Sequence, residues 1–440
     1  MSSDNTDPVI LSAVRTPIGS FQKSLKNLTA PELGAIVIRE ALQRAGIDGE
    51  SVDEVIMGQV LQGGVGQAPA RQAALGAGLP AGVPATTINK VCGSGLKSVM
   101  LASSMIKAGD GSVFVAGGQE SMSNAPYFMK TARSGLRLGN AEVTDMLIHD
   151  GLWCAIDDCH MGDLAEYTAE KASITREELD AFSADSQRKA AEAQAAGKFT
   201  AEIVPVEIPQ RKGDPIVVSE DEYIRPETTA ESLGRLRPAF IRDGIVTAGN
   251  ASGINDGASA LVVTSRAAAE EAGAPVMARI TGYTQASVEA KDIFFAPISA
   301  IRKLMEQMGT SIGDYDLIEA NEAFAAQALA DGKELGWDWD RVNIHGGSIA
   351  LGHPIGASGA RVLTTLIYAL KDRGLKTGLA SLCLGGGGAC RTFSTSPSGT
   401  SISRRCSLTC SSCPTSPMSG RAPEVGRYEP VPAIEKLHSS

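Results

Sequence analysis

Strand-like and helix-like stretches alternate along residues 1–390 of this 440-residue chain. The apolar runs predicted to form strands are Val9–Val14, Val55–Val60, Val113–Gly118 and Ala260–Thr264. Between the first two runs, Thr29 and Glu32 have the spacing of a capping box, which predicts the start of a helix. This alternation favours a layered α/β architecture.

Composition and charge exclude several classes of protein. The chain is 43% hydrophobic, so it can bury a large core without depending on disulfides or metal ions. Its net charge of -10 disfavours a nucleic-acid-binding surface. No apolar run reaches the roughly 18 residues of a membrane helix, and the polar, acidic N-terminus is unlike a targeting peptide. We therefore expect a cytoplasmic protein whose cysteines stay reduced.

Two parts of the chain depart from the α/β alternation. Residues 122–254 are polar, with one clear helix predicted between the Thr175 capping box and Gly197, and we interpret them as an inserted lobe. Residues 391–440 are rich in Ser, Pro and Thr and show no hydrophobic period, so we predict that they are mostly disordered.

Two cysteines each begin a glycine-rich turn after an apolar run. Cys92 precedes Gly93 and Gly95 at the predicted start of a helix, where the helix dipole and free N–H groups stabilise a thiolate. Cys383 precedes a run of glycines that includes Gly385, and such a run offers backbone N–H groups to an oxyanion. The pair predicts acyl chemistry on sulfur, with Cys92 as nucleophile and Cys383 as acid and base. A buried structural cysteine and a glycine-rich surface turn are the alternatives.

Two further polar residues are candidates for the same chemistry. His353 lies between Gly352 and Pro354, which suits a base that activates a nearby thiol, although it could also be a satisfied core histidine. Asn321 lies between an apparent strand and a helix. Its amide could hold a water molecule that donates to an oxyanion, or it could cap the helix.

Three other motifs carry weaker signals. Gly64–Pro69 begins like a dinucleotide-binding turn, but Pro69 replaces the third glycine, so we reject NAD binding. Cys406, Cys410 and Cys413 have metal-like spacing but lie in the Ser/Pro-rich tail. Cys154, Cys159 and His160 are close in sequence but lack a fourth ligand, so we expect no metal.

Four segments together resemble the active-site motifs of the thiolase family, in the same order. They are Asn89–Lys97, Asn321–Ala325, Gly352–Gly359 and Cys383–Gly387. The resemblance covers roughly residues 8–389. It implies a five-layer α-β-α-β-α fold with a loop domain that binds coenzyme A. The implied core domains are residues 1–121 with 255–275 and residues 276–390, and the implied loop domain is residues 122–254.

The resemblance also implies a role for each candidate residue. Cys92 would be acylated after activation by His353, and Cys383 would take the α-proton of a second acetyl-CoA. The backbone N–H groups of Cys92 and Gly385 would hold one oxyanion, while His353 and a water on Asn321 would hold the other. The implied reaction is the reversible Claisen condensation of two acetyl-CoA to acetoacetyl-CoA and CoA. It needs no metal or redox cofactor, because coenzyme A is substrate and product.

Three segments of the predicted loop domain resemble coenzyme A contacts of the family. Cys159–Gly162 is similar to a segment that lines the pantetheine end of the pocket, Asp221–Arg225 to one whose arginine lies against the adenine, and Thr247–Gly253 to a pantetheine-contacting turn. The residues expected to contact substrate or coenzyme A are His160, Met161, Arg225, Ala248, Ser252 and Phe324. The forms of the Cys92 and Met161 segments resemble the short-chain, acetoacetyl-CoA-forming subgroup.

The chain departs from the family pattern after Ala389. Cys390–Thr395 replaces the apolar last strand that the resemblance implies, which predicts the loss of a central strand and exposed strand edges. An altered reading frame or an unusual 3′ end is our hypothesis for the origin of the tail. The alternative function is therefore a catalytically impaired thiolase-fold subunit that still binds coenzyme A. A ketoacyl synthase is a weaker interpretation, because that family lacks a Cys383-type glycine motif.

The resemblance further implies a homo-oligomer. Residues Tyr127–Asp145 occupy the place of the family's tetramerisation loop, so we expect a tetramer rather than a dimer.

Overall fold

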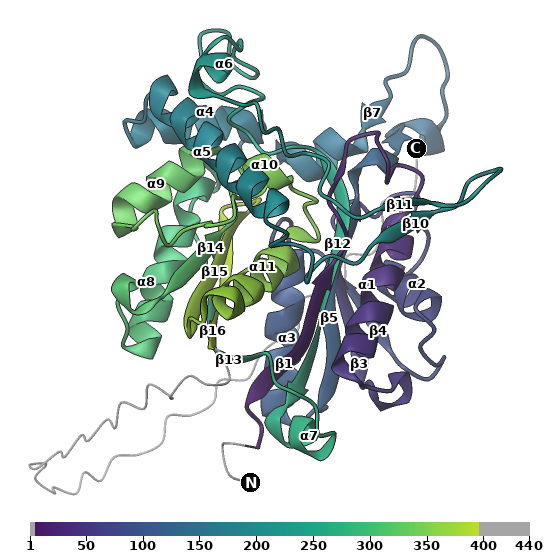
Figure 1. The fold of residues 1–440 in the computed structure, drawn as a ribbon. Coiled ribbons are helices and arrows are strands. Elements are labelled where there is room, and N and C mark those ends of the chain that lie inside the picture. Colours follow the sequence, from purple (N-terminus) through teal and green to yellow (C-terminus); the bar gives the residue numbers. More distant parts are fainter. Residues whose placement is uncertain (1–4, 396–440) are drawn as a thin grey trace, which may run out of the picture. The chain divides into compact units, whose positions relative to one another are not determined.

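A ten-stranded mixed sheet forms the centre of the protein, whose computed structural model describes residues 5–395 (Figure 1). Neighbouring strands follow the order β14 (Leu317–Ala320), β15 (Thr377–Leu384), β16 (Gly388–Thr395), β13 (Ala278–Ser287), β1 (Pro8–Arg15), β12 (Asn255–Ser265), β5 (Val113–Ser121), β3 (Glu54–Gly58) and β4 (Ala85–Ile88). β2 (Gly19–Ser20) pairs with β12. The pairs β14–β15, β3–β4 and β3–β5 are parallel, and the predicted α/β class is confirmed.

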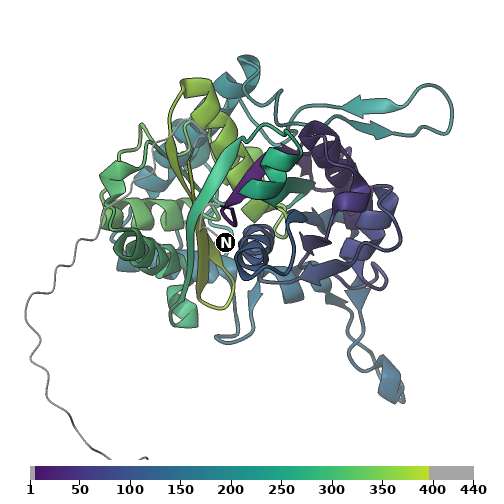
Figure 2. The same ribbon diagram turned by 90° about the horizontal axis from the view of Figure 1, so that it is seen from below.

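Helices cover both faces of this sheet. The main ones are α1 (Ala30–Ala45), α2 (Pro69–Gly76), α3 (Ser94–Ala108), α7 (Arg266–Glu271), α8 (Ala296–Met308), α9 (Ala325–Leu335), α10 (Ser348–Leu351) and α11 (Ser358–Arg373). One apolar core joins α1 and α2 to strands β1, β3, β5 and β12. A second core joins α3 and α11 to strands of both the N-terminal and the C-terminal part, so these two helices lie between them (Figure 2).

Local capping explains where the predicted helices begin. The Thr29 side chain accepts from the N–H of Glu32, and the Glu32 carboxylate accepts from the N–H of Thr29. The same reciprocal pair forms between Thr175 and Glu178 at the start of α5 (Arg176–Ala195). Both predicted capping boxes are confirmed.

The C-terminal strand corrects one expectation. Gly388–Thr395 forms β16, which pairs antiparallel with β13 on one side and β15 on the other. The central strand is therefore present despite its polar sequence, because a ladder of backbone hydrogen bonds does not require apolar side chains. The prediction of disorder is wrong for residues 391–395. For residues 396–440, with their three cysteines, it lies outside the described residues.

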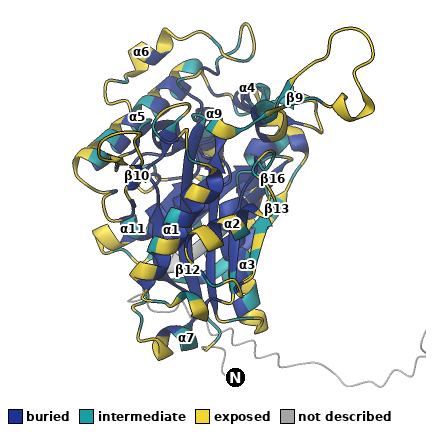
Figure 3. Cartoon of the chain, turned by 90° about the vertical axis from the view of Figure 1, so that its right-hand side faces the viewer, coloured by how far each residue is buried: buried dark blue, intermediate teal, exposed yellow. Residues whose placement is uncertain are grey.

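Residues 122–254 form small elements beside the main sheet. They are the helices α4 (Met161–Lys171), α5 and α6 (Ala230–Gly234) and the hairpins β6–β7 (Tyr127–Phe128, Thr144–Asp145), β8–β9 (Trp153–Cys154, Cys159–His160) and β10–β11 (Val206–Ile208, Ile216–Val218). The long loop that joins β6 to β7, called here the β6–β7 excursion (residues 127–145), projects from the main body of the protein, as does the β10–β11 hairpin (Figures 1 and 2). Figure 3 shows exposed residues on the projecting excursion, in contrast to the buried sheet. Tyr127, Leu136, Leu138 and Val143 are its exposed large apolar side chains.

None of the helices described is long and apolar enough to cross a membrane.

Candidate active site

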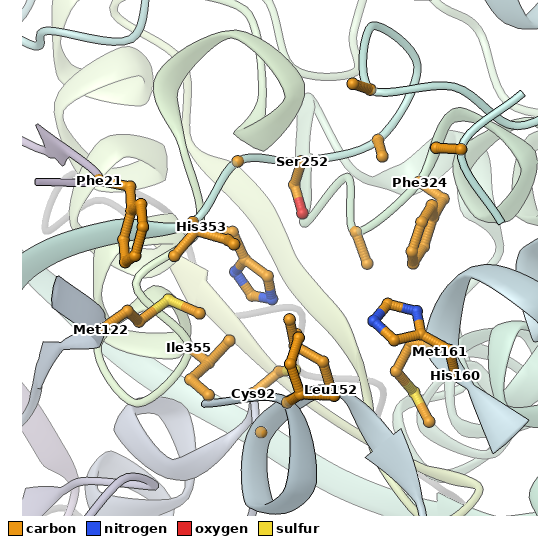
Figure 4. A pocket seen from close by; sticks show the side chains of 18 of the residues that line it. Phe21, Cys92, Met122, Leu152, His160, Met161, Ser252, Phe324, His353 and Ile355 are labelled. Atoms are coloured by element: carbon orange, nitrogen blue, oxygen red, sulfur yellow. The ribbon is translucent and has the colours of Figure 1, made fainter. Parts of the chain in front are cut away.

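A cavity of about 640 Å³ opens where the ends of β4 and β15 meet the loops of residues 122–254. It brings together segments as far apart in the sequence as Ser20 and Gly385. The predicted site residues that line it are Cys92, His353, Cys383, Gly385, His160, Met161, Arg225, Ala248, Ser252 and Phe324. Figure 4 shows the imidazole of His353 on the same side of the cavity as Cys92, and that of His160 beside Met161.

Cys92 lies in a tight turn between β4 and α3. Val91 adopts a φ of 47°, a left-handed conformation that is strained for a β-branched residue. The Ser94 hydroxyl holds this turn, because it accepts from the N–H of Lys90 and donates to the carbonyl of Val91. The turn aims the thiol into the cavity instead of into the core.

The cavity leaves Cys92 partly accessible, yet protein atoms surround its thiol. Burial raises the pKa of Cys92 to about 12, and the nearby N–H groups of Cys92 itself and Gly385 oppose this rise. The resting thiol is therefore neutral at pH 7. The same two N–H groups lie close enough to hydrogen-bond a negative charge that forms beside the sulfur.

His353 is fixed by contacts on its backbone and on its ring. Its N–H donates to Asn255 Oδ1 at 2.9 Å, and its Nδ1 lies 2.7 Å from Ser358 Oγ. Its Nε2 is buried and has no hydrogen-bond partner among the described residues. Burial, and after it the charge of Arg361, lower the pKa of His353 to about 3. The imidazole is therefore neutral at pH 7 and can accept a proton.

Cys383 and Gly385 stand at the end of β15. Cys383 is almost completely buried, and its register partner in β16 is Ala389. Burial, and then the proximity of Cys92, raise the pKa of Cys383 well above its usual value. Because β16 is formed, the backbone after Cys383 is held on the sheet, and Gly385 reaches the cavity.

Asn321 differs from the other candidates. It is completely buried and does not line the cavity. It directly follows β14, and β14 pairs with β15, the strand that carries Cys383. Its backbone N–H donates to the carbonyl of Ser381, and its Oδ1 accepts from Ser348 Oγ at 2.6 Å. Its Nδ2 has no hydrogen-bond partner among the described residues. The amide does not cap α9, whose N-cap is Phe324.

An aromatic wall forms the opposite side of the cavity. His160 caps α4, since its Nδ1 accepts from the N–H of Gly162 at 3.0 Å. Its ring stacks on Phe240 with centroids 4.9 Å apart, and Phe240 meets Phe324 edge to face. The imidazole of His160 is the polar group of this otherwise apolar wall.

The remaining predicted contacts lie along the approach to the cavity. Arg225 is exposed, and its guanidinium lies 5.0 Å from the ring centroid of Tyr223. The N–H of Ser252 donates to the carbonyl of Ala323, which ties this turn to the segment that carries Phe324. Ala248 is an exposed lining residue.

Several lining residues were not identified from the sequence. They are Phe240, Phe294, Ile355 and three residues of a π-helical turn over Leu147–Leu152, namely Ile148, Gly151 and Leu152. Ile355 lies within the Gly352–Gly359 motif but was not predicted to line a cavity, and the others lie outside every motif, so no sequence signal distinguishes them from core residues. Within residues 5–395, no group of three or more His, Cys, Asp or Glu side chains is placed to hold a metal ion.

Comparison with known proteins points to one family. Residues 8–267 match the model of the thiolase N-terminal domain, and residues 274–394 match that of the thiolase C-terminal domain. An acetyl-CoA acetyltransferase of Pseudomonas aeruginosa is 57% identical over 381 residues, which cover 87% of this chain and 97% of the relative. One of Escherichia coli is 55% identical over 86% of this chain and 96% of its own length.

A solved structure agrees with these sequence matches. The crystal structure of the Bacillus anthracis acetyl-CoA acetyltransferase superposes with a TM-score of 0.88 at 45% identity, covering 90% of this chain and all of that one.

Proposed function

This chain belongs to the thiolase family, and from that premise we propose that it is an acetyl-CoA acetyltransferase that condenses two acetyl-CoA reversibly to acetoacetyl-CoA and CoA. The observation that carries the proposal is the convergence of Cys92, His353 and Cys383 on one cavity that also contains the apolar wall of His160 and Phe324. Such a cavity can hold a thioester against two thiols and a base.

The first half-reaction acylates Cys92. His353 Nε2 takes the thiol proton while the sulfur attacks the acetyl carbonyl, and the N–H groups of Cys92 and Gly385 hold the developing oxyanion. The departing sulfur of CoA takes a proton from Cys383. Acetyl-Cys92 then holds the electrophile, Cys383 is a thiolate and His353 is protonated.

The second half-reaction forms the carbon–carbon bond. The Cys383 thiolate takes the α-proton of a second acetyl-CoA, and His353 with a water on Asn321 holds the enolate oxygen. The enolate carbon attacks the acetyl group, Cys92 sulfur leaves, and His353 returns its proton to that sulfur. At the end of the cycle Cys92 has regained its proton from His353, Cys383 has regained one from the α-carbon, and the proton that Cys383 first gave up leaves on CoA.

Family membership also supports finer proposals. These are the five-layer core with the domain boundaries predicted above, and coenzyme A contacts from His160, Met161, Arg225, Ala248, Ser252 and Phe324. They further include a cytoplasmic location and a tetramer built through the exposed apolar side chains of the β6–β7 excursion.

A thiolysis assay tests the function. We expect the full-length protein to cleave acetoacetyl-CoA with CoA, and Cys92→Ala to lose this activity. Activity that survives Cys92→Ala would contradict the mechanism. Absence of activity in the unaltered protein would favour the alternative of an impaired coenzyme A-binding subunit, although the loss of a central strand that motivated it is not observed.

A further inference from the structure

Arg361, in the first turn of α11, is a buried cation with few partners. Its exposed fraction is 2%, and its Nε and Nη1 have no hydrogen-bond partner among the described residues. The nearest carboxylate oxygen, on Glu319, is 3.8 Å away. Its Nη2 donates to Ser348 Oγ at 2.8 Å. A buried charge with incomplete pairing is costly, so this arrangement calls for an explanation beyond stability.

Ser348 connects this cation to Asn321. A guanidinium only donates hydrogen bonds, so the Ser348 hydroxyl uses a lone pair toward Arg361 and keeps its proton for another acceptor. Asn321 Oδ1, 2.6 Å away, is that acceptor. The flipped amide would place Nδ2 against the hydroxyl and leave a buried proton without an acceptor, which disfavours it roughly fivefold to a hundredfold.

The hydrogen bonds from Arg361 to Ser348 and from Ser348 to Asn321 therefore decide whether the oxygen or the nitrogen of the Asn321 amide is free. Because Oδ1 is occupied, the remaining group is the donor Nδ2, which is buried and unpartnered among the described residues. A free donor can stabilise a negative oxygen directly or through one water molecule, whereas a free carbonyl oxygen would repel it.

We propose that Ser348 and Arg361 are positioning residues that fix the Asn321 amide with Nδ2 free to serve the enolate oxyanion. The proposal rests on the function proposed above and adds two residues to it. The same guanidinium also acts on His353, since its charge contributes, after burial, to the low pKa of that imidazole. One buried cation thus influences both groups assigned to the second oxyanion.

Half-reactions of Ser348→Ala test the proposal. Acetylation of Cys92 by acetyl-CoA, followed by intact mass, uses only the first oxyanion and is expected to stay within twofold of wild type. Thiolysis of acetoacetyl-CoA passes through the enolate, and its kcat is expected to fall about fivefold to tenfold with KM for CoA unchanged. Ser348→Thr, which keeps the hydroxyl, is expected to restore the rate.

Ser103→Ala is the matched control, because Ser103 is also completely buried and, among the described residues, its hydroxyl bonds only the carbonyl of Val99 within α3. We expect it to leave both half-reactions unchanged. In a double-mutant cycle, Ser348→Ala with Asn321→Ala should be no slower than Asn321→Ala alone, since Ser348 acts through Asn321.

Three outcomes would overturn the proposal. The first is a thiolysis kcat of Ser348→Ala that stays within twofold of wild type. The second is a double variant, Ser348→Ala with Asn321→Ala, whose loss of kcat is the product of the two single losses. The third is an equal loss of acetylation and thiolysis rates in Ser348→Ala together with a lowered melting temperature. Each leaves the proposed function standing, because wild type is active in all three. A wild type without thiolysis would instead overturn the proposed function, and this inference with it.

Discussion

His353 Nδ1 lies 2.7 Å from Ser358 Oγ, and the Ser358 hydroxyl itself donates to the carbonyl of Pro354 at 2.9 Å. A serine hydroxyl has one proton, so Ser358 is the acceptor in its contact with the ring. Nδ1 therefore carries the imidazole proton, and Nε2 presents a lone pair. The geometry thus selects the tautomer that can act as a base.

Ser358→Ala should weaken this selection. Losing one buried hydrogen bond of about 1 kcal/mol should lower the rate of Cys92 acetylation by roughly fivefold. The measurement is the single-turnover rate with acetyl-CoA. Ser183→Ala removes a buried hydroxyl that donates to the carbonyl of Leu179 within α5, so it is the control and should have no effect. An unchanged rate in Ser358→Ala would show that other contacts fix the tautomer.

The buried neutral imidazole predicts a specific dependence of stability on pH. The pKa of His353 is about 3 in the folded protein against 6.5 ordinarily, so below pH 6.5 the unfolded chain binds more protons at this site. The contribution of His353 to stability is therefore lost as pH falls from 6.5 toward 3. At pH 5 the loss is about 2 kcal/mol.

His353→Gln should remove this part of the pH dependence. Between pH 7.5 and pH 5, wild type should lose about 2 kcal/mol more unfolding free energy than the variant. Denaturant titrations at fixed protein concentration measure both. Parallel pH profiles for the two proteins would contradict the assignment of a neutral, buried imidazole.

Gly118→Ala should push the loop that carries His353 and Gly356 away from strand β5 of the sheet. A Cβ at Gly118 would lie 2.0 Å from the carbonyl oxygen of Gly356, and backbone cannot yield as a flexible side chain can. We expect a loss of about 1–3 kcal/mol in stability together with reduced thiolysis. Gly82→Ala is the control, since a Cβ there meets nothing within 4 Å. Wild-type activity in Gly118→Ala would show that the loop tolerates displacement.

Truncations test the contribution of β16. A chain that ends at Thr395 keeps both ladders of this strand and should retain wild-type thiolysis. A chain that ends at Gly387 lacks the strand between β13 and β15, exposes two strand edges, and should aggregate. Soluble yield and kcat measure both. Full activity of the shorter chain would show that the strand is dispensable.

Much of the fold was predictable because its signals are local. Capping boxes at Thr29 and Thr175 depend on two side chains three positions apart, so the sequence contains the whole motif. β16 was mispredicted because its polar composition hides it. It forms a short hairpin with β15 and pairs on its other edge with β13, which lies far earlier in the chain, so its place in the sheet depends on backbone partners outside residues 388–395.

For the site, the sequence alone determined the chemistry-bearing residues and the family they resemble, since cysteine, histidine and glycine at those spacings define the local turns. Only the tertiary structure decided which groups meet. It placed Cys92, His353 and Cys383 on one cavity and Asn321 outside its surface, completed that cavity with unpatterned apolar residues, and fixed the orientation of two polar side chains. Burial and the direction of a hydrogen bond depend on neighbours from other segments, and that is why these properties could not be inferred from local sequence.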